Sequence, residues 1–215
     1  MSFLIYHNLG LGDHIVCNGM VRHFAESSDV YLFSKQKNYY SVKTMYSDNS
    51  RITVVPVVDD EDAKEKYANW NIIKIAVGCA NPEWNPNSDT PFDIIFYEQA
   101  GIPHDYRWSK FLCAHDHMVS NPTGDYAFIH DDVARGYTIK AKPMMPIVRP
   151  STEEFAIADW FAVLANAKEI HCINSAFLIL ADQVKTTGRL YWHKYARNEG
   201  ALCNPTVRKT WTIIE

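Results

Sequence analysis

The sequence predicts an α/β protein of two small Rossmann-like lobes that face a central cleft, each lobe being of minimal size. Short apolar runs alternate with amphipathic segments through both halves of the chain, as is typical of parallel sheets with crossover helices. A loop with breaker residues, Asn121-Pro122 and Gly124, interrupts this pattern, which restarts at Asp125. We therefore expect an N-terminal lobe over 1–118 and a C-terminal lobe over 119–215.

Composition narrows the class of protein. The chain has 215 residues, of which 47% are hydrophobic, and a net charge of -4, so no global basic field favours nucleic acid. Its five cysteines are widely spaced and form no C-x-x-C motif, which fits a reducing compartment. The first apolar run starts within a few residues of the N-terminus, and no apolar run is long enough for a membrane span. We expect a cytoplasmic protein without a membrane span.

The first half contains four strand–helix pairs. Each expected strand is a short apolar run, and these runs occupy 3–6, 30–33, 51–57 and 72–77. The helix after the first strand carries Ile15, Val16, Met20 and Phe24 on one face. The other expected helices occupy 35–47, 59–70 and 92–100. The acidic residues at 59–62 suit a helix N-terminus, and Gly101 suits a helix end.

The second half repeats the same pattern with no detectable sequence repeat. Apolar runs predict strands at 125–130, 169–174, 189–192 and 211–214. We expect one helix from Thr152 to Ala167, capped by Ser151 or Thr152, and a second helix over 175–185.

The turn Gly10-Leu11-Gly12-Asp13-His14, between the first strand and its helix, is the strongest local signal. Glycines let the backbone turn tightly and approach a ligand, and the helix N-terminus favours an anion. A dinucleotide fingerprint is excluded, because Ile15 replaces its third glycine and the second strand ends without an acid. No P-loop motif occurs. The simpler alternative is that the glycines only turn the chain and Asp13 only caps the helix.

Two segments of the second half also directly follow an expected strand, as the Gly10–Asp13 turn does in the first half. His130-Asp131-Asp132 and Arg135 follow a strand, and a planar guanidinium suits a pyrophosphate. Asn174-Ser175-Ala176-Phe177 leads from a strand into a helix N-terminus, whose amides can bind a phosphate. The simpler alternatives are turn residues, an ordinary exposed arginine and a helix cap.

These residues carry a resemblance. Gly10-Leu11-Gly12-Asp13 resembles the G-L-G-D turn of the heptosyltransferase-type glycosyltransferases, and the run from Glu169 to Phe177 is similar to a strand–Ser–helix segment of two-Rossmann glycosyltransferases. The resemblance implies a GT-B-like fold whose first lobe faces the acceptor and whose second lobe binds the nucleotide sugar. It also implies that Asp13 deprotonates the acceptor and that Arg135 binds the diphosphate. The glutamate that binds the ribose of the donor in these glycosyltransferases has no evident equivalent in this sequence, unless it is Glu153 or Glu154.

We expect an inverting, metal-independent transfer of a sugar from a nucleotide-diphosphate donor to a hydroxyl of a glycan or lipid-linked acceptor. Asp13 is the candidate base and His14 the reserve base, although a histidine in a first helical turn is more often polar surface. The leaving diphosphate needs donors to stabilise it. We expect donor binding by His130, Arg135, Asn174, Ser175, Ala176 and Phe177, beside a cleft loop of Gly10, Leu11 and Gly12.

The sequence is also compatible with two other functions. The same fold could serve a non-catalytic nucleotide- or sugar-binding protein, which the small size favours somewhat, or a sugar-nucleotide epimerase. The run from Cys113 to His117 could hold a metal, but two histidines one residue apart need an extended chain and a third ligand. We expect no metal and no cofactor.

Overall fold

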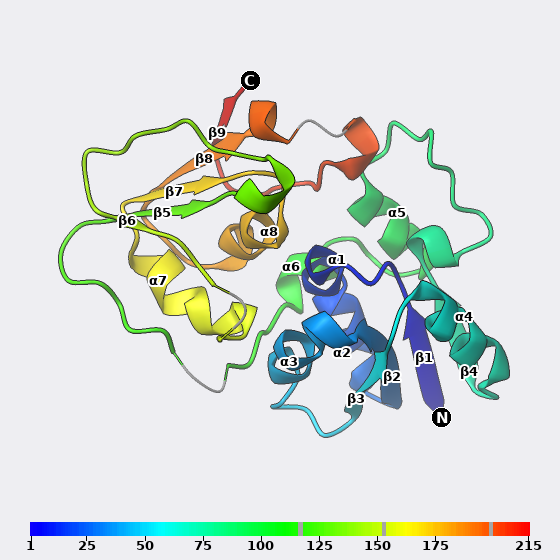
Figure 1. Cartoon of the computed structure of the whole chain (residues 1–215). Helices are drawn as coiled ribbons and strands as arrows, with labels where there is room; N and C mark the ends of the chain where they lie inside the picture. The colour runs from blue at the N-terminus through cyan, green and yellow to red at the C-terminus, as the bar shows by residue number, and fades with distance from the viewer. Residues whose placement is uncertain (116–117, 152–153, 198–199) are drawn as a thin grey trace. The chain divides into compact units, whose positions relative to one another are not determined.

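The computed structural model of the chain describes residues 1–115, 118–151, 154–197 and 200–215 (Figure 1). It divides into two compact units. The first comprises Met1–His115 and Ala201–Thr206, and the second comprises Asp116–Gly200 and Val207–Glu215. The expected lobe boundary at 118/119 lies close to this division. The expectation also assigned Ala201–Thr206 to the C-terminal lobe, whereas in the structure that segment packs with the first unit.

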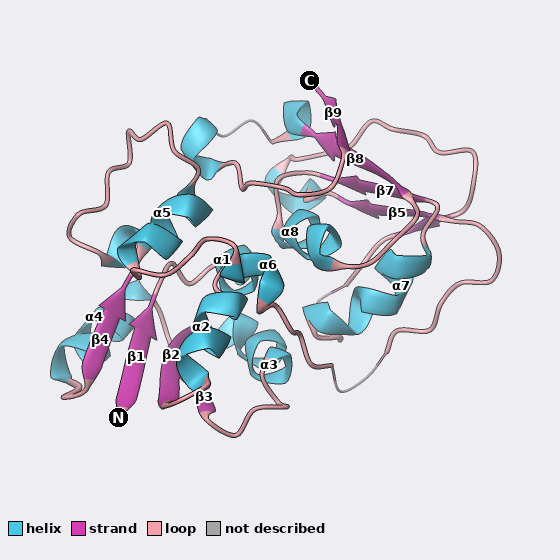
Figure 2. Cartoon of the chain, turned by 180° about the vertical axis from the view of Figure 1, so that it is seen from behind, coloured by secondary structure: helices cyan, strands magenta, loops and turns pink. Residues whose placement is uncertain are grey.

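Within its described residues, the first unit contains a sheet of four parallel strands in the order β3-β2-β1-β4 (Figure 2). The strands are β1 (Ser2–Tyr6), β2 (Asp29–Lys35), β3 (Ile52–Val57) and β4 (Ile73–Ala76). The helices are α1 (Leu11–Val16), α2 (Asn18–Ala25), α3 (Gln36–Met45), α4 (Asp60–Asn69), α5 (Phe92–Gln99) and α6 (Tyr106–Ser109), with a 3-10 turn η1 (Gly78–Ala80). The four predicted strands are confirmed, and so are the helices predicted at 35–47, 59–70 and 92–100.

The segment after β1 forms two consecutive helices where the periodicity predicted one. The Cys17 N–H donates to the Asp13 carbonyl at 2.8 Å, and the Val21 N–H donates to the Cys17 carbonyl at 2.9 Å. The hydrogen-bond ladder therefore continues through the junction between α1 and α2. Ile15 and Met20 are fully buried, as their place on the predicted apolar face requires.

The acidic run at 59–62 begins α4, because negative charge is favourable at a helix N-terminus. Asp59 is the N-cap, and its side chain accepts hydrogen bonds from the backbone N–H groups of Glu61 and Asp62. Three further acids occupy the first turn, where the helix dipole stabilises negative charge. The predicted start of this helix is confirmed.

In the second unit, the described residues form a sheet of five parallel strands in the order β6-β5-β7-β8-β9. The strands are β5 (Ala127–His130), β6 (Ile147–Val148), β7 (Glu169–Cys172), β8 (Arg189–His193) and β9 (Trp211–Ile214). The helices are α7 (Phe161–Asn166) and α8 (Ala176–Gln183), with 3-10 turns η2 (Val133–Arg135), η3 (Ile157–Trp160) and η4 (Lys194–Ala196). A further 3-10 turn, η5 (Ala201–Cys203), belongs to the first unit. The sequence predicted all of these strands except the two-residue β6.

The helix expected over 152–167 is shorter than predicted. The described chain bends near Phe155, forms η3 and enters α7 only at Phe161. The buried carboxylate of Asp159 accepts the Ala156 N–H at 2.9 Å and so stabilises a 3-10 turn at that point. Ser151 does not cap α7, whose N-cap residue is Trp160, and the Ser151 carbonyl accepts the Trp160 Nε1–H. The alternative cap, Thr152, lies outside the described residues.

The two faces of the second sheet are covered differently. Phe128 of β5 contacts the rings of Trp160 and Phe177, so η3 and α8 cover its face. The adjacent Ile129 points to the opposite face and packs with Ile139 and Tyr137. That face is therefore covered by the connection between β5 and β6, which carries the single turn η2 and otherwise irregular backbone in its described residues.

Two separate parallel sheets with crossover helices confirm the prediction of an α/β protein with two small Rossmann-like lobes. None of the helices in the described part of the chain combines the length and the apolar character that a bilayer crossing requires.

Candidate active site

The Gly-rich turn joins the carboxyl end of β1 to α1. Gly10 is the N-cap residue, with an ordinary extended backbone (φ -75°, ψ 149°), and Asp13 lies in the first turn of the helix. The Asp13 carboxylate folds back over Gly10, since a Cβ built on Gly10 would lie 2.5 Å from Asp13 Oδ2. Gly10 is exposed, and Leu11, Gly12 and Asp13 are partly exposed. The turn thus presents a carboxylate at the sheet edge where α/β proteins bind ligands.

A hydrogen bond to the segment after β4 holds the chain between β1 and the Gly-rich turn in place. The Cys79 N–H donates to Asn8 Oδ1 at 2.9 Å, which joins the carboxyl ends of β1 and β4. Gly78 has φ +64°, and a Cβ there would lie 2.7 Å from Asn8 Oδ1 and 2.5 Å from the Phe96 ring, so only glycine fits. Burial, and after it the charge of Asp13, raises the pKa of the Cys79 thiol. Asn8 and Cys79 therefore belong to the Asp13 environment. Neither was predicted as a site residue, although Asn8 lies two residues after the first predicted strand and Cys79 directly follows the glycine that ends the fourth.

His14 lies in the interior. Its side chain is fully buried, and its ring packs edge-on against His7 at 4.5 Å between centroids. Burial, and after it the neighbouring His7, holds the pKa of His14 well below its usual value. The simpler alternative, that His14 is polar surface, is wrong, because the first turn of α1 faces the core on this side.

In the second unit, the residues after β5 form a tight turn. Asp132 caps η2 and accepts hydrogen bonds from the Arg135 N–H at 3.2 Å and from Arg135 Nε at 2.5 Å. The Asp131 side chain is 4% exposed, bonds the Ile139 N–H and pairs with Arg149. The acids therefore act as turn residues, which was the simpler alternative. The Arg135 side chain is 62% exposed and remains open to a ligand.

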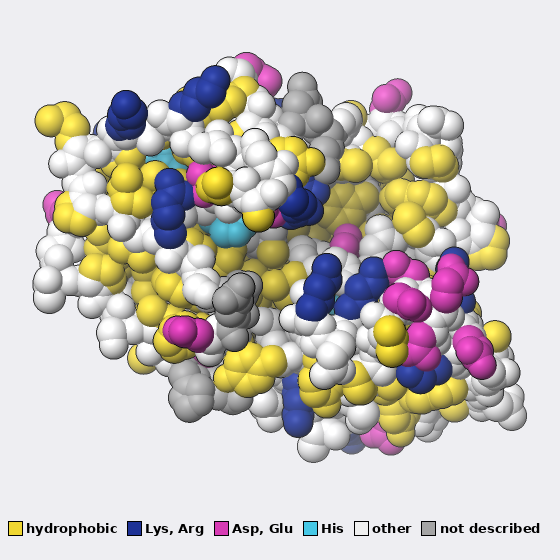
Figure 3. Space-filling model, viewed as in Figure 1, with side chains coloured by type: hydrophobic (Ala, Val, Ile, Leu, Met, Phe, Trp, Pro, Cys, Tyr) yellow, Lys and Arg dark blue, Asp and Glu magenta, His cyan; other side chains and the backbone are white. Residues whose placement is uncertain are grey.

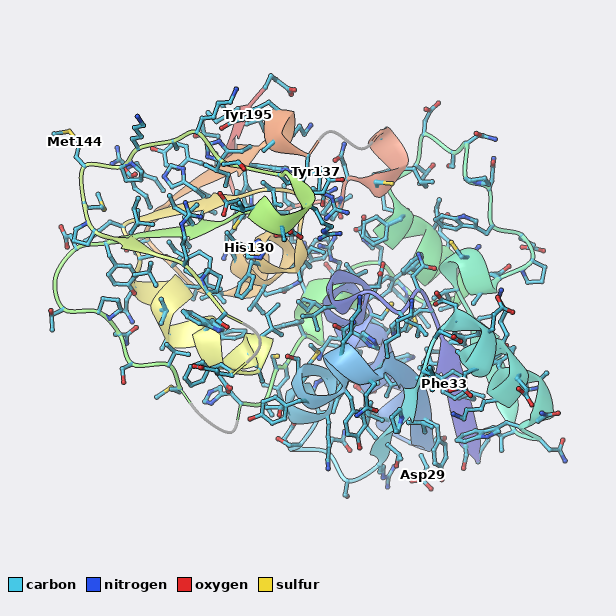
Figure 4. All side chains as sticks on the ribbon, in the orientation of Figure 1. Asp29, Phe33, His130, Tyr137, Met144 and Tyr195 are labelled. Carbon is cyan, nitrogen blue, oxygen red and sulfur yellow. The ribbon has the colours of Figure 1, made fainter. Side chains whose placement is uncertain are left out.

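Two arginines flank one tyrosine at this end of the sheet. The guanidinium carbons of Arg135 and Arg197 lie 5.7 Å and 5.5 Å from the ring centroid of Tyr137 (Figure 4). Arg197 Nη1 also donates to the Asn174 carbonyl at 2.8 Å, directly before α8. We call Arg135, Tyr137 and Arg197 the arginine cluster. Tyr137 was missed in the sequence. Arg197 ends the run from His193 to Arg197, which follows a predicted strand and is expected either to begin a solvated helix or to contact an acidic sugar or phosphate; only the fold brings it to Tyr137.

The N-terminus of α8 lies beside this cluster. Ser175 is the N-cap residue in an extended conformation, and its Oγ is buried without a hydrogen-bond partner among the described residues. Phe177 is buried, and its ring packs against His130 at 4.6 Å. Burial lowers the pKa of His130 to about 4, so this ring is neutral at pH 7. The structure thus brings together His130, Asn174, Ser175 and Phe177, and places the partly exposed Ala176 in the first turn of α8.

Other candidate residues are less well placed. Glu154, one of two candidates to hold a ribose, is exposed before η3, and Glu153 lies outside the described residues. In the run considered for a metal, Cys113 is buried and His115 exposed, whereas Asp116 and His117 are not described. The described residues contain no group of three or more His, Cys, Asp or Glu side chains arranged to hold a metal ion.

Comparison with known proteins gives structural matches alone. No family model and no curated protein matches the sequence. A glycosyl transferase family 9 protein from Veillonella parvula DSM 2008 matches with a TM-score of 0.58 and 9% identity, over 99% of this chain and 86% of that one. E. coli heptosyltransferase WaaC with ADP matches with a TM-score of 0.53 and 11% identity, over 100% and 93%. The same enzyme with ADP-2-deoxy-2-fluoro heptose gives 0.51 and 12%, over 99% and 92%.

These similarities extend over nearly the whole chain, as the sequence resemblance implied, and at 9–12% identity they concern the fold. The chain has the two-lobed, GT-B-like fold of the heptosyltransferase-type glycosyltransferases.

Proposed function

We propose that this protein is a glycosyltransferase that moves a sugar from a nucleotide-diphosphate donor to a hydroxyl of a glycan or lipid-linked acceptor, with inversion and without a metal. The observation that carries the proposal is the arginine cluster beside the α8 N-terminus, in a fold whose structural neighbours include a heptosyltransferase with ADP and with an ADP-sugar analogue. The acid-bearing turn after β1 supplies the complementary chemistry.

The donor diphosphate is assigned to the second unit. Arg135 offers an exposed guanidinium, and Arg197 lies against the Asn174 carbonyl, next to the free amides of α8. Arginine and helix-terminal N–H groups bind phosphate oxygens with charge-assisted hydrogen bonds. The buried, unpartnered Ser175 Oγ adds a further donor. His130 is neutral, so it contributes a ring surface with Phe177 and no charge.

The acceptor hydroxyl is assigned to the first unit, with Asp13 as the general base. The carboxylate takes the hydroxyl proton while the acceptor oxygen attacks the anomeric carbon of the donor. The bond from that carbon to the phosphate oxygen breaks, and the nucleoside diphosphate leaves with the electron pair, stabilised by the guanidinium groups and amides. We assign the base to Asp13 in preference to His14, because the ring of His14 is fully buried.

A thermal-shift panel identifies the donor class. The melting temperature of the full chain is measured with ADP, UDP, GDP or CDP, and separately with a nucleotide sugar derived from each. A ligand that binds the folded state raises the melting temperature by mass action. We expect one nucleoside diphosphate and its sugar derivative to do so. A melting temperature unchanged by every member of the panel would contradict the assignment of the second unit.

Loss of either arginine should weaken the binding of that nucleoside diphosphate. Arg135→Ala and Arg197→Ala each remove a charge-assisted contact, and we expect about tenfold weaker binding for each, equivalent to about 1.4 kcal/mol. Titration calorimetry measures the effect. Lys168→Ala is the matched control, because it removes an exposed cation just before β7, at the opposite end of the strands. Equal affinities in the two arginine variants and the wild type would refute the diphosphate site.

Gly10→Ala should separate folding from catalysis. Any residue can adopt φ -75°, and the atom that the new Cβ would meet is the end of the flexible Asp13 side chain. We therefore expect near-normal stability, but up to about 10²-fold slower turnover, because the base is displaced. Gly200→Ala is the control, since no atom lies within 4 Å of a Cβ built there. Undiminished turnover of Gly10→Ala would show that the position of the carboxylate is unimportant.

A further inference from the structure

The second unit contains a groove of about 550 Å³ on the face of its sheet opposite α8. Its floor is formed by alternate residues of β7 and β8, namely Glu169, His171, Arg189, Tyr191 and His193. Its wall is the chain at 141–145 and includes Met144, which Figure 4 shows at the outer bend of that segment. Figure 3 shows histidine side chains at the surface of the second unit, with Lys and Arg side chains near them. The volume is that of a small-molecule site.

The groove exists because the connection between β5 and β6 lacks a crossover helix. A parallel sheet is normally covered on both faces and has apolar residues on each. Here Ile170 and Leu190 follow that rule on the α8 face, where they are buried. On the opposite face the same strands carry polar side chains, above which passes irregular backbone.

A directed chain of hydrogen bonds runs along the groove floor. Glu169 pairs with Arg189 and is therefore a carboxylate, which can only accept hydrogen bonds. It must receive the Nε2–H of His171, at 3.2 Å, so His171 Nδ1 is an acceptor. His193 Nε2 lies 2.9 Å from that atom and must donate to it. His193 Nδ1 is then left as an acceptor.

That last atom is unsatisfied. His193 is 3% exposed and lines the groove, and its Nδ1 has no hydrogen-bond partner among the described residues. Buried polar atoms are almost always hydrogen-bonded, and an exception points to a missing partner. Because the open atom is an acceptor, the partner must bring an O–H or N–H group.

The floor of the groove carries no net charge, and Lys142 of the wall adds one cation whose N–H groups can donate to a hydroxyl oxygen. Glu169 and Arg189 neutralise each other. Burial lowers the pKa of His193 to about 4, and burial also lowers the pKa of His171, despite the opposing effect of Glu169, so both rings are neutral at pH 7. Tyr191 and Tyr195 add aromatic surface, and Tyr191 stacks on His171 at 4.5 Å. Hydroxyl groups on a compact ring match this combination of an acceptor, a paired charge and aromatic walls.

We propose that this groove is a second ligand site, which binds a neutral saccharide unit with one hydroxyl donating to His193 Nδ1. The site is separate from the diphosphate site, because none of the residues assigned to the diphosphate lines the groove. It does not depend on the proposed transferase activity, so each can fail without the other.

The test follows the ring nitrogens of His193 by ¹⁵N NMR on the full chain. Without ligand, both His171 and His193 should be Nε2–H tautomers. Glucose, N-acetylglucosamine and maltose are then titrated, with tetrahydropyran as the ring that lacks hydroxyl groups. We expect at least one saccharide to shift His193 Nδ1 in a saturable manner and tetrahydropyran to leave it unshifted. Absence of a shift with all three saccharides, an equal shift with tetrahydropyran, or displacement of the saccharide by the bound nucleoside diphosphate would each overturn the proposal.

His193→Phe removes the acceptor and keeps a ring of similar size. We expect the saccharide to bind about tenfold more weakly, as for one lost hydrogen bond of about 1.4 kcal/mol, with nucleoside diphosphate affinity unchanged as evidence of folding. Should this variant fail to fold, the tautomers and shifts in the unmodified protein still decide the matter. Unweakened saccharide binding by a folded His193→Phe protein would exclude His193 as the contact.

Discussion

Asp13→Asn should lower turnover of the nucleotide sugar by about 10²–10⁴-fold, the usual contribution of a general base. The substitution keeps the size of the side chain and removes the carboxylate that lies over Gly10. Gly10 is the N-cap of α1, so the helix keeps its capping residue and the melting temperature should change little. Turnover is measured as acceptor-dependent release of nucleoside diphosphate, with the donor that the thermal-shift panel identifies.

Asp29→Asn is the control for this substitution. It makes the same chemical change at an exposed carboxylate of the first unit, at the amino end of β2, opposite to the strand ends that carry the candidate site. Turnover should remain normal in this variant. If Asp13→Asn folds, binds donor and also turns over normally, then Asp13 has a structural role alone and the base is another residue.

Asp93→Asn should destabilise the protein by about 3–5 kcal/mol, because it leaves a buried charge without its partner. Asp93 on α5 and Arg107 on α6 are both fully buried and form an ion pair. The carboxylate also accepts hydrogen bonds from the Thr206 N–H at 3.0 Å and pairs with His104 Nε2 at 2.7 Å. Arg107 Nη1 donates to the Thr206 carbonyl at 2.8 Å. Chemical denaturation of the full chain measures the loss.

A double variant serves as the control. Asp93→Asn with Arg107→Met removes both charges, and it should be less destabilised than Asp93→Asn alone, since an uncompensated buried charge is the main cost. A single variant as stable as the wild type would mean that the pair contributes nothing to folding.

The same carboxylate gives a pH dependence of defined sign. Burial would raise the pKa of Asp93, but the hydrogen bonds from His104 and Thr206 and the charge of Arg107 outweigh it and lower the pKa to about 2. Because the unfolded carboxyl titrates near 3.8, its contribution to stability is complete above that pH and is lost as the pH falls towards about 2. Acid unfolding of the wild type should therefore steepen in this range, and the slope should diminish in Asp93→Asn.

The sequence predicted those parts of the fold that depend on short, continuous stretches of residues. Apolar runs bounded by turn residues located the strands that carry both candidate sites, since strand formation depends on short patterns. The helix predicted from Thr152 failed because a single buried carboxylate, Asp159, favours a 3-10 turn. The two-residue β6 is too short to produce a pattern. The return of Ala201–Thr206 to the first unit depends on Asp93 and Arg107, which lie about a hundred residues away.

The candidate site was predictable in part for the same reason. The Gly10–Asp13 turn and the start of α8 are continuous in sequence and could be found from it. Tyr137 and Arg197 come from segments sixty residues apart, and only their contact reveals the arginine cluster. His14 was misplaced because its first-turn position conceals that its side of α1 faces the core. The groove on the second sheet could not be predicted, because the sequence does not show which face of the sheet the helices leave uncovered.

The most direct test of the proposed function is transfer itself. The full chain is incubated with the nucleotide sugar that binds, with and without a preparation of glycans and lipid-linked acceptors, and the products are analysed by mass spectrometry. We predict that nucleoside diphosphate is released and a larger glycoside forms only when acceptor is present, and that Asp13→Asn abolishes most of both. Donor that binds without any acceptor-dependent release would identify a binding protein, and an isomerised donor formed without acceptor would identify an epimerase; either result would contradict a glycosyltransferase.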